Sequence, residues 1–365
     1  MDYCVKDKDT NSKTCYEKDT LIKIAKQYNN NHSDKINLKS KNLYENIKKK
    51  LNKDSPCSKD ICWLNIDYLD ELKPDLLKTL RPEVPENWYN NKEQWLNTLD
   101  IMSVMKQYEK KHNDFIFLGA SPKDYDFITY SNQCVSNELC KFSLSNHLKN
   151  GKKKIGLIFN TDNHNEGGQH WVSIFIDLNK CGIYYVDSVG EEPLDNFIKF
   201  MNKVKCQGDS LIYNNKININ DIDNDHMIID DYEQLSDTII SVPNANKYKI
   251  GNIINLCNNK KLNCNNNYKI INICDNNLLL DKKIKNKSKN IIQKTFRIFH
   301  SKIQHQKGNN ECGMYSIHFI DNMINGMNFY NYVKNRKSDK YMNELRYSKY
   351  FLPIRMIPKN NYFGI

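Results

Sequence analysis

Three short stretches of this chain contain the residue types that hydrolysis by a thiol requires. Gln306 lies six residues before Cys312, and Gly313 follows the cysteine where an apolar, helix-like run begins. Far upstream, His170 opens one strand-like run and Asp187 closes the next. A cysteine, a histidine, a carboxylate and an amide donor are the groups that nucleophilic catalysis by a thiol uses. The sequence therefore predicts a cysteine-type hydrolase.

Cys312 is the predicted nucleophile because of its position. A thiol attacks a carbonyl as the thiolate, and an ordinary cysteine, with a pKa of about 8.5, is mostly protonated at neutral pH. The first turn of a helix favours negative charge, and a nearby imidazolium favours it further. A lone cysteine at such a place is more often a buried helix residue. Gln306 and Gly313 beside it favour the catalytic interpretation, since Gly313 lets a substrate backbone come close.

His170 is the predicted general base, although other histidines compete for this role. It ends a Gly-rich loop and begins an apolar run, so a strand could support its ring at the edge of a cleft. Asp187 ends the neighbouring run and could orient the imidazole and stabilise its charged form. His300 and His305 are closer to Cys312 in the sequence, and they remain alternatives.

Two more assignments concern the oxyanion and the substrate. Gln306 rather than Gln304 is expected to donate to the oxyanion, because the turn that follows it can fold its amide back toward the cysteine. Trp171 has two interpretations, as a packed residue on the strand face or as a wall beside the substrate.

Apolar periodicity predicts that these residues lie on the elements of an α+β protein. A polar turn at 179–182 suggests that two of the strands form a hairpin. The expected strands are 115–118, 154–160, 170–177, 183–186 and 295–300, and the expected helices of the same region are 95–111, 193–205 and 313–325.

The chain is expected to fall into two parts. Residues 1–90 have the pattern of a helical arm, and 81–85 that of an extended linker, because each proline biases its predecessor away from helix. Residues 91–365 would form the catalytic domain. An Asn-rich, low-complexity insertion at about 213–290 is expected to be partly ordered at most, since its Ile residues show no sustained period.

Composition excludes several classes of protein. No apolar run approaches the length of a membrane-spanning helix, so membrane insertion is not expected. The charged N-terminal stretch lacks the apolar run of a signal peptide, which favours a cytosol-like compartment with mostly reduced cysteines. The cysteine spacings do not match a zinc site, and neither a metal nor another cofactor is expected. The net charge of +11 predicts a diffuse basic surface, with nucleic-acid contact as the alternative.

The ordered motifs resemble those of the SUMO-specific protease family and its viral relatives, which include the polyprotein-processing proteases of African swine fever virus and other large DNA viruses. The resemblance rests on His170-Trp171, Val186-Asp187-Ser188, Gln306 six residues before Cys312-Gly313, and Trp95-Leu96-Asn97. There are two departures. Glu311 stands where the cellular enzymes have Asp before the nucleophile, and Asp187 stands where the swine fever enzyme has Asn.

This resemblance implies a papain-like α+β core in which a mixed sheet carries His170 and Asp187 and packs on the helix that begins at Cys312. It implies cleavage after Gly-Gly in viral structural polyproteins during virion maturation. From their own positions in the sequence, Trp171 and Gly313 are the residues assigned to substrate contact. The protein would then act in the virion and in the host cytoplasm, at viral assembly sites. Removal of SUMO or ubiquitin-like proteins from host proteins is the enzymatic alternative. An inactive basic scaffold that binds nucleic acid is the alternative from another class.

Overall fold

A computed structural model describes residues 3–5, 13–55, 57–214, 216–217, 228–231, 233–257, 267–285, 290–293 and 295–352. Contacts divide the chain into two compact units. Unit 1 comprises residues 1–112, 306–317 and 337–365, and unit 2 comprises residues 113–305 and 318–336. The predicted division into an arm of residues 1–90 and a catalytic domain of residues 91–365 stays a prediction.

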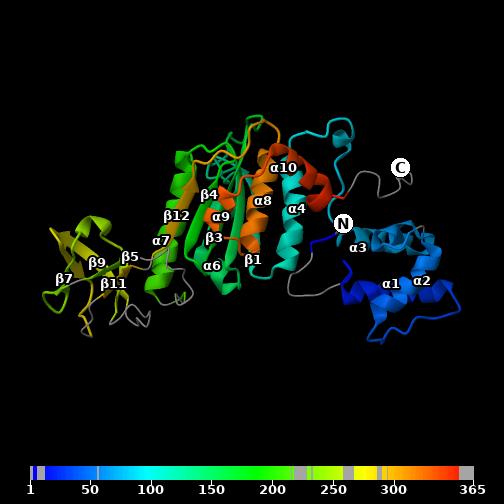
Figure 1. The fold of residues 1–365 in the computed structure, drawn as a ribbon, viewed down its shortest axis with the longest axis horizontal. Coiled ribbons are helices and arrows are strands. Elements are labelled where there is room, and N and C mark those ends of the chain that lie inside the picture. The colour runs from blue at the N-terminus through cyan, green and yellow to red at the C-terminus, as the bar shows by residue number, and fades with distance from the viewer. Residues whose placement is uncertain are drawn as a thin grey trace. The chain divides into compact units, whose positions relative to one another are not determined.

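The N-terminal part of unit 1 is a small helical assembly with a core of its own. Helix α1 (Lys18–Asn31) buries Leu21, Ile24, Ala25 and Tyr28, the spacing of an amphipathic helix. These side chains belong to one cluster with residues of α2 and with the fully buried Trp63. The elements, blue in Figure 1, are α1, α2 (Leu43–Asp54), η1 (Asp60–Asn65), η2 (Asp67–Leu72) and α3 (Lys73–Leu77).

The rest of unit 1 contains η3 (Glu86–Tyr89), α4 (Thr98–Lys111), α10 (Asp339–Leu345) and the π-helical turn η6 (Arg346–Tyr350). A capping box starts α4, because Asn97 and Asp100 each accept a hydrogen bond from the other's backbone. The C-terminal elements follow each other directly, so that Arg346 marks the point at which α10 passes into η6.

Unit 2 is built on a five-stranded mixed sheet. The strands are β1 (Phe115–Pro122), β2 (Lys154–Asn160), β3 (Trp171–Asp177), β4 (Gly182–Val186) and β12 (Arg297–Ser301), in the order β1-β2-β3-β4-β12. The central pairs β2–β3 and β3–β4 are antiparallel, whereas the outer pairs β1–β2 and β4–β12 are parallel. The predicted α+β class and the predicted hairpin of β3 and β4 are confirmed.

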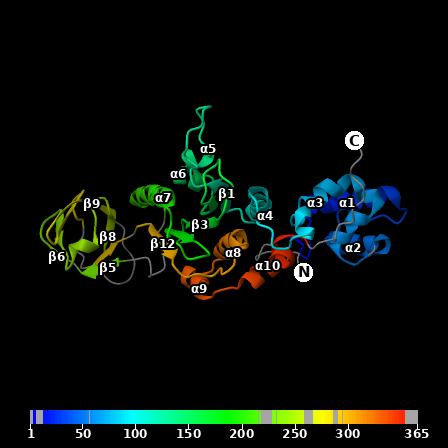
Figure 2. The same cartoon turned by 90° about the horizontal axis from the view of Figure 1, so that it is seen from above.

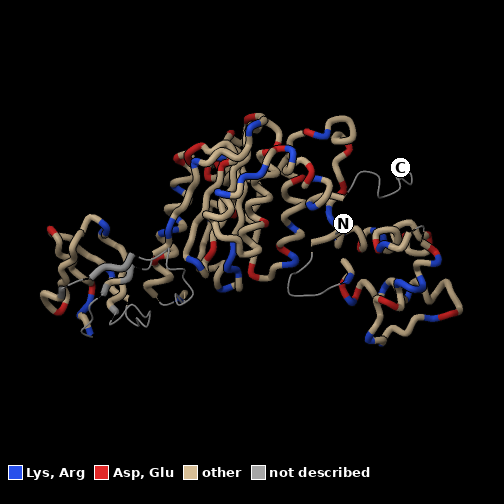
Figure 3. Tube along the Cα trace, viewed as in Figure 1, with Lys and Arg blue, Asp and Glu red and all other residues tan. Residues whose placement is uncertain are grey.

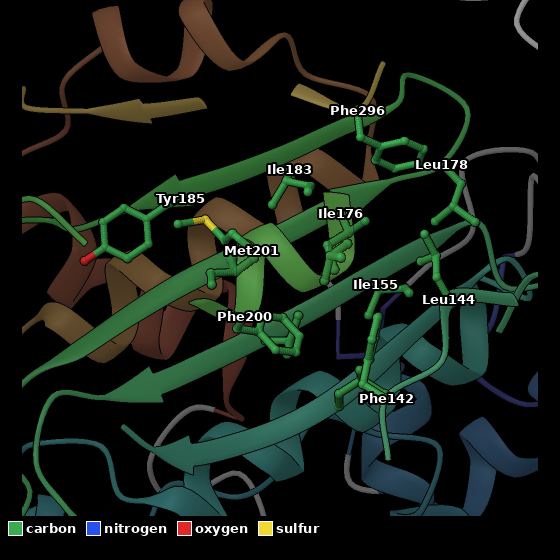
Figure 4. Packing of buried hydrophobic residues seen from close by; sticks show 14 of the residues in the cluster. Phe142, Leu144, Ile155, Ile176, Leu178, Ile183, Tyr185, Phe200, Met201 and Phe296 are labelled. Carbon is green, nitrogen blue, oxygen red and sulfur yellow. The ribbon is translucent and has the colours of Figure 1, made fainter. Parts of the chain in front are cut away.

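Helices cover both faces of this sheet. Alternate residues of β2, Ile155, Leu157 and Phe159, join the apolar side of α7 (Asp195–Tyr213) in the main hydrophobic cluster, part of which Figure 4 shows. Gly156 faces the other way, where a Cβ would come within 3.1 Å of Ile320. Ile320 belongs to helix α8 (Cys312–Ile324), so α7 and this part of α8 lie on opposite faces (Figure 2).

The described residues of unit 2 also include three short helices outside the insertion. They are α5 (Asn137–Cys140), α6 (Leu144–Lys149) and α9 (Phe329–Lys334). Leu139 of α5 and Leu144 of α6 belong to the main cluster.

The described residues of the Asn-rich insertion form a second sheet, which the lack of a sustained Ile period did not predict; the expectation that the insertion is partly ordered at most stays a prediction. Seven strands in the order β5-β11-β8-β9-β10-β7-β6 enclose a separate apolar cluster. They are β5 (Ile228–Asp231), β6 (Glu233–Gln234), β7 (Ile239–Ser241), β8 (Ile253–Cys257), β9 (Asn267–Cys274), β10 (Asn277–Leu280) and β11 (Asn290–Gln293), with the short helix η5 (Ala245–Lys247).

Two local features explain how the described residues of the insertion form a sheet in spite of their composition. Tyr268 and Ile270 are buried while Lys269 between them is exposed, which is the period of two of a strand with one buried face. Two asparagines, Asn255 and Asn267, are buried in this sheet. They can be accommodated there because their side chains are joined by a 2.6 Å hydrogen bond. A buried amide with a partner does not carry the cost of an unsatisfied polar group.

The expectation of mostly reduced cysteines is wrong for six of them. Disulfides join Cys4 to Cys15, Cys57 to Cys62 and Cys134 to Cys140. Their Cα atoms are 5.7, 5.8 and 6.5 Å apart, within the usual range for a disulfide. Each bridge closes a short loop, and spacing that does not suit a zinc site can still bring two sulfurs together. The expected compartment stays a prediction.

Charged residues of both signs are scattered along the chain in both units (Figure 3). This agrees with a diffuse distribution of the positive charge, and contact with nucleic acid stays a prediction. Among the described residues, no helix combines the length and the apolar character that crossing a membrane requires.

We expect the catalytic sheet to fold without the insertion. Replacing residues 213–290 by a short Gly/Ser linker removes Ile217 and Ile253, which pack in the main cluster. Burial of one such side chain is worth roughly 1.5–3 kcal/mol, so the melting temperature should fall while hydrolysis of a small peptide persists. Melting curves and kcat/KM on a peptide would check this, and loss of soluble protein would contradict it.

Candidate active site

His170 and Asp187 are brought together by two neighbouring strands. His170 immediately precedes β3 and Asp187 immediately follows β4, and these strands are antiparallel with Ser173 opposite Val186. The start of one strand therefore lies beside the end of the other. The His170 Nε2 atom is 2.8 Å from Asp187 Oδ1, and the two side chains are 21% and 3% exposed. The contact that the sequence predicts between them is present.

Glycines shape the loops on either side of this pair. Gly168, with a φ of +78°, lies where a Cβ would be 3.1 Å from the Asn160 amide, and it ends the loop that leads to His170. Gly190, with a φ of +85°, lies where a Cβ would be 2.7 Å from the Lys302 carbonyl oxygen. Both positions combine a left-handed backbone with a close neighbour, a combination that favours glycine.

The Asp187 contact fixes the tautomer of the imidazole. The carboxylate Oδ1 also accepts the Val189 N–H at 2.8 Å, which holds the carboxylate in place. Because an ionised carboxylate only accepts hydrogen bonds, Nε2 of His170 carries a proton. In the neutral ring, Nδ1 is then the nitrogen that can take a proton from a thiol.

Gln306 and Cys312 lie at the two ends of the turn that starts α8, in unit 1. Cys312 is the first residue of α8 and is 3% exposed, and Gly313 follows it, also buried. Gln306 is 2% exposed, and its Nε2 atom donates a 2.7 Å hydrogen bond to the Gly308 carbonyl. Gln304, by contrast, is exposed.

Asp339, at the start of α10, holds the first half of this turn. Its Oδ2 atom accepts the N–H groups of Lys307 and Gly308 at 3.0 and 2.7 Å, and its Oδ1 atom accepts the Tyr315 hydroxyl at 2.9 Å. Sequence reasoning missed Asp339, because it lies 27 positions beyond Cys312 in a tail that carries no motif. A capped helix start after Ser338 is the one local signal that could have drawn attention to it.

The competing histidines have other partners. His300 is exposed on β12 and pairs with Glu192, with 3.1 Å between Nδ1 and Oε2. His305 is buried, its Nε2 lies 3.0 Å from the Val333 carbonyl oxygen, and burial lowers the pKa of its imidazole. Of these three candidates, His170 has the buried carboxylate partner that a general base of this type uses.

The candidate residues thus form two sets. His170, Trp171 and Asp187 belong to unit 2, where Trp171 is the first residue of β3 and is largely buried. Gln306, Cys312 and Gly313 belong to unit 1. Within each set the arrangement fits the predicted roles, and the roles themselves stay predictions.

Comparison with known proteins identifies viral relatives, although no family model matches the chain. The protein named "Putative thiol protease R355" of Acanthamoeba polyphaga mimivirus is 33% identical over 233 residues, which cover 56% of this chain and 73% of that protein. A protein of African swine fever virus that is named as a cysteine protease is 26% identical over 148 residues, which cover 38% of this chain and 54% of that protein.

Solved structures show a more distant likeness. A crystal structure of the African swine fever virus protease has a TM-score of 0.49 and 17% identity, covering 86% of this chain and 91% of that one. A structure of the SUMO protease Ulp1 has a TM-score of 0.31 and 14% identity, covering 69% and 76%.

Asp187→Asn should reduce activity without abolishing it. The Asn oxygen can still accept the Nε2 hydrogen, so only the charge that stabilises the imidazolium is lost. A hydrogen bond to a charged group is worth about 1 kcal/mol more than a neutral one, which corresponds to roughly fivefold in kcat. The basic limb of the pH–rate profile should move to lower pH, because the imidazolium loses its proton more readily. Complete loss of activity in a folded variant would show that Asp187 has a further role.

The two glutamines should differ sharply. Gln306→Ala should lower kcat by about 10²–10³-fold with little change in KM, as expected for loss of one oxyanion donor. Gln304→Ala is the matched control and should remain within a few-fold of the unmodified protein, since its side chain is exposed. Steady-state kinetics on one peptide would rank them, and the opposite ranking would refute the assignment.

Proposed function

This chain belongs to the family of viral thiol proteases that includes R355 of mimivirus, and on that premise we propose that it cleaves viral structural polyproteins after Gly-Gly during virion maturation. The protein is a viral cysteine protease of the SUMO-protease type. The substrate, the cleavage motif and the stage of the viral cycle are the content of the proposal.

The observation that carries the proposal is the His170–Asp187 pair at the open end of the β3–β4 hairpin, 2.8 Å apart. A base oriented by a buried carboxylate supports proton transfer from a thiol. We assign Cys312 as the nucleophile, and Gln306 with the Cys312 backbone N–H as the donors to the oxyanion. The start of α8 supports this, since the first amides of a helix have no partner within the helix.

The reaction then proceeds in two balanced halves. His170 takes the Cys312 proton, the thiolate sulfur bonds to the scissile carbonyl carbon, and the carbonyl oxygen becomes an oxyanion. As the C–N bond breaks, the imidazolium gives its proton to the leaving amine and a thioester remains. A water molecule, deprotonated by His170, attacks the thioester, and the thiol is restored when the sulfur leaves and regains the proton.

The burial of the nucleophile supports a small residue at the cleavage point. Cys312 is 3% exposed and Gln306 is 2% exposed. An extended backbone without side chains reaches such a sulfur with the least obstruction, and Gly313 adds no side chain next to it. These features favour Gly-Gly over bulkier sequences. Action at viral assembly sites in the host cytoplasm and in the virion is part of this proposal.

Removal of SUMO-like proteins from host proteins is the second candidate. Relatives of this chain in African swine fever virus isolates are named as a SUMO-1 cysteine protease. Such modifiers and the proposed polyprotein sites share the Gly-Gly motif, so the cleavage chemistry would be the same. The two candidates differ in what precedes the two glycines, a short polypeptide segment or a folded ubiquitin-like protein.

We expect a fluorogenic Gly-Gly peptide to be hydrolysed by the protein, and not by its Cys312→Ser or His170→Ala variant. A serine hydroxyl is far less acidic than a thiol, and without a base both proton transfers are lost. His300→Ala is the matched control, because His300 is exposed and pairs with Glu192, and it should retain full activity. More than a few per cent of activity in folded Cys312→Ser would refute the assignment.

The same protein separates the two substrates. If the virus's structural precursors are cut after Gly-Gly, mass spectrometry will detect the new N-termini, while a SUMO or ubiquitin fusion is cut slowly. Preference for the fusion would support the second candidate. Failure to cut either one while the peptide is cleaved would refute both substrate proposals and leave the thiol chemistry intact.

A further inference from the structure

The fully buried guanidinium of Arg346 pairs with Glu311, the residue that precedes the proposed nucleophile Cys312. Arg346 is 0% exposed and begins the π-helical turn η6. Its Nε and Nη2 atoms both donate to Glu311 Oε2, each at 2.9 Å. Glu311 is 3% exposed and is covalently joined to Cys312. A buried charge of this kind persists only when it is paired and hydrogen-bonded.

The same guanidinium also holds the backbone of the turn. Its Nη2 atom donates to the Asn310 carbonyl oxygen at 3.1 Å, and its Nη1 atom donates to the Gln94 carbonyl oxygen. Its planar face lies 4.7 Å from the centre of the Trp88 ring. Arg346 therefore contacts the two consecutive residues before Cys312, one through the side chain and one through the main chain. The planar fork of arginine suits such multiple contacts, and a lysine cannot reproduce them.

The second oxygen of Glu311 is also occupied. Asn343 of α10 donates to Glu311 Oε1 at 2.9 Å and to the Lys92 carbonyl at 3.0 Å. Burial raises the pKa of the Glu311 carboxyl, whereas Arg346 and Asn343 oppose that rise. The carboxylate thus has a partner on each oxygen, and its negative charge is compensated next to the residue that must become a thiolate.

Both halves of the turn are held by the same C-terminal segment. Asp339 accepts the N–H groups of Lys307 and Gly308, and Arg346 holds Asn310 and Glu311. The carbonyl and amide groups of this turn are thereby fixed by α10 and η6, elements that follow Cys312 in the sequence. Held at both ends, the turn cannot shift the start of α8 without breaking these bonds.

We propose that Arg346, acting through Glu311 and the Asn310 carbonyl, is the positioning residue that sets the direction of the Cys312 thiol and backbone N–H. This inference rests on the proposed function of Cys312. A displacement of about 1 Å in a reacting group can cost roughly 10²-fold in rate, so a buried clamp at this place has a catalytic reason. Stability alone is a weaker reason, because buried ion pairs can often be replaced by apolar residues without loss.

The Arg346→Lys variant keeps the positive charge but loses the planar guanidinium that donates to several acceptors at once. We expect kcat, expressed per titrated Cys312 thiol, to fall by about 10²-fold while KM stays within a few-fold. Titration with an electrophilic Gly-Gly peptide, followed by mass spectrometry of the Cys312 peptide, counts the enzyme whose site is folded and reactive, because an unfolded chain has no site to bind that peptide. A purely structural role would reduce the number of titrated sites and the melting temperature and leave kcat per site unchanged.

Glu311→Gln is the second variant, for the case in which Arg346→Lys fails to fold. The glutamine is nearly isosteric, and its carboxamide oxygen can still accept from Arg346, but the negative charge is gone and its NH2 group faces the Asn343 amide nitrogen that donates to Glu311. We expect kcat per titrated site to fall by roughly tenfold, in line with a charged hydrogen bond of about 1.5 kcal/mol.

Arg81→Lys is the matched control. Arg81 is also buried, and its Nη1 atom donates to the Ser348 carbonyl of η6 at 3.0 Å. The Arg81→Lys variant thus loses a guanidinium–carbonyl hydrogen bond to η6, as Arg346→Lys loses such bonds, but this one lies outside the turn before Cys312. Its kcat per titrated site should remain within twofold of the unmodified protein.

The outcomes separate this inference from the proposed function. If folded Arg346→Lys or Glu311→Gln retains the unmodified kcat per site, the positioning role is refuted while Cys312 remains the nucleophile. An equal loss in Arg81→Lys would also refute it, since the effect would then be general. If the unmodified protein cleaves no Gly-Gly peptide, or if Cys312→Ser cleaves it, the proposed function itself fails.

Discussion

The antiparallel pairing of β3 with β4 is the constraint on which the candidate base depends. The register that places Ser173 opposite Val186 also places His170, which precedes β3, beside Asp187, which follows β4. Side chains alternate between the two faces of a sheet, so a shift of one residue would turn the residues that pack in the main cluster toward the opposite face. Ile174 and Ile176 are fully buried in the main cluster and oppose such a shift. The hydrophobic core therefore fixes a polar contact at its edge.

Each of the two sets of candidate residues lies next to a buried carboxylate, and the two carboxylates have similar kinds of partners. The Asp187 carboxylate accepts hydrogen bonds from the His170 imidazole and from a backbone N–H. The Glu311 carboxylate accepts hydrogen bonds from the Arg346 guanidinium and from a side-chain amide. In each case the carboxylate is almost completely buried, and its hydrogen bonds offset the loss of water. Removing one partner of such a buried carboxylate is costly because it leaves an uncompensated charge. Both carboxylates thus hold a neighbouring residue in one orientation, His170 in one unit and the start of α8 in the other.

Local patterns in the sequence predict the elements around the site well. The strand expected at 154–160 matches β2, and the hairpin and the helix that begins at Cys312 are present. Those segments have regular apolar periods, and tertiary contacts reinforce what each segment favours by itself. The amphipathic helix expected at 193–205 extends to Tyr213, because its apolar side continues through Leu211 and Ile212 into the same cluster.

What the sequence does not reveal depends on partners that are distant in the chain. The Glu311–Arg346 pair spans 35 residues, and no local period connects its members. In the insertion, the hydrogen bond between Asn255 and Asn267 allows both side chains to be buried. Composition alone does not reveal this bond, so a high asparagine content suggests disorder. The disulfides likewise depend on how short loops fold back, which spacing does not specify.

The position of the insertion follows from the topology of the catalytic sheet. Since β12 lies parallel to β4, the chain must cross from one end of the sheet to the other between them, and α7 makes part of that crossing. A crossover that already leaves the sheet can be lengthened at little further entropic cost, because loop closure grows only slowly with length. The added sheet packs on its own cluster and reaches the main one through Ile217 and Ile253. Among the described residues, β3 and β4, which flank His170 and Asp187, pair only with strands of the catalytic sheet, so their register does not depend on the inserted one.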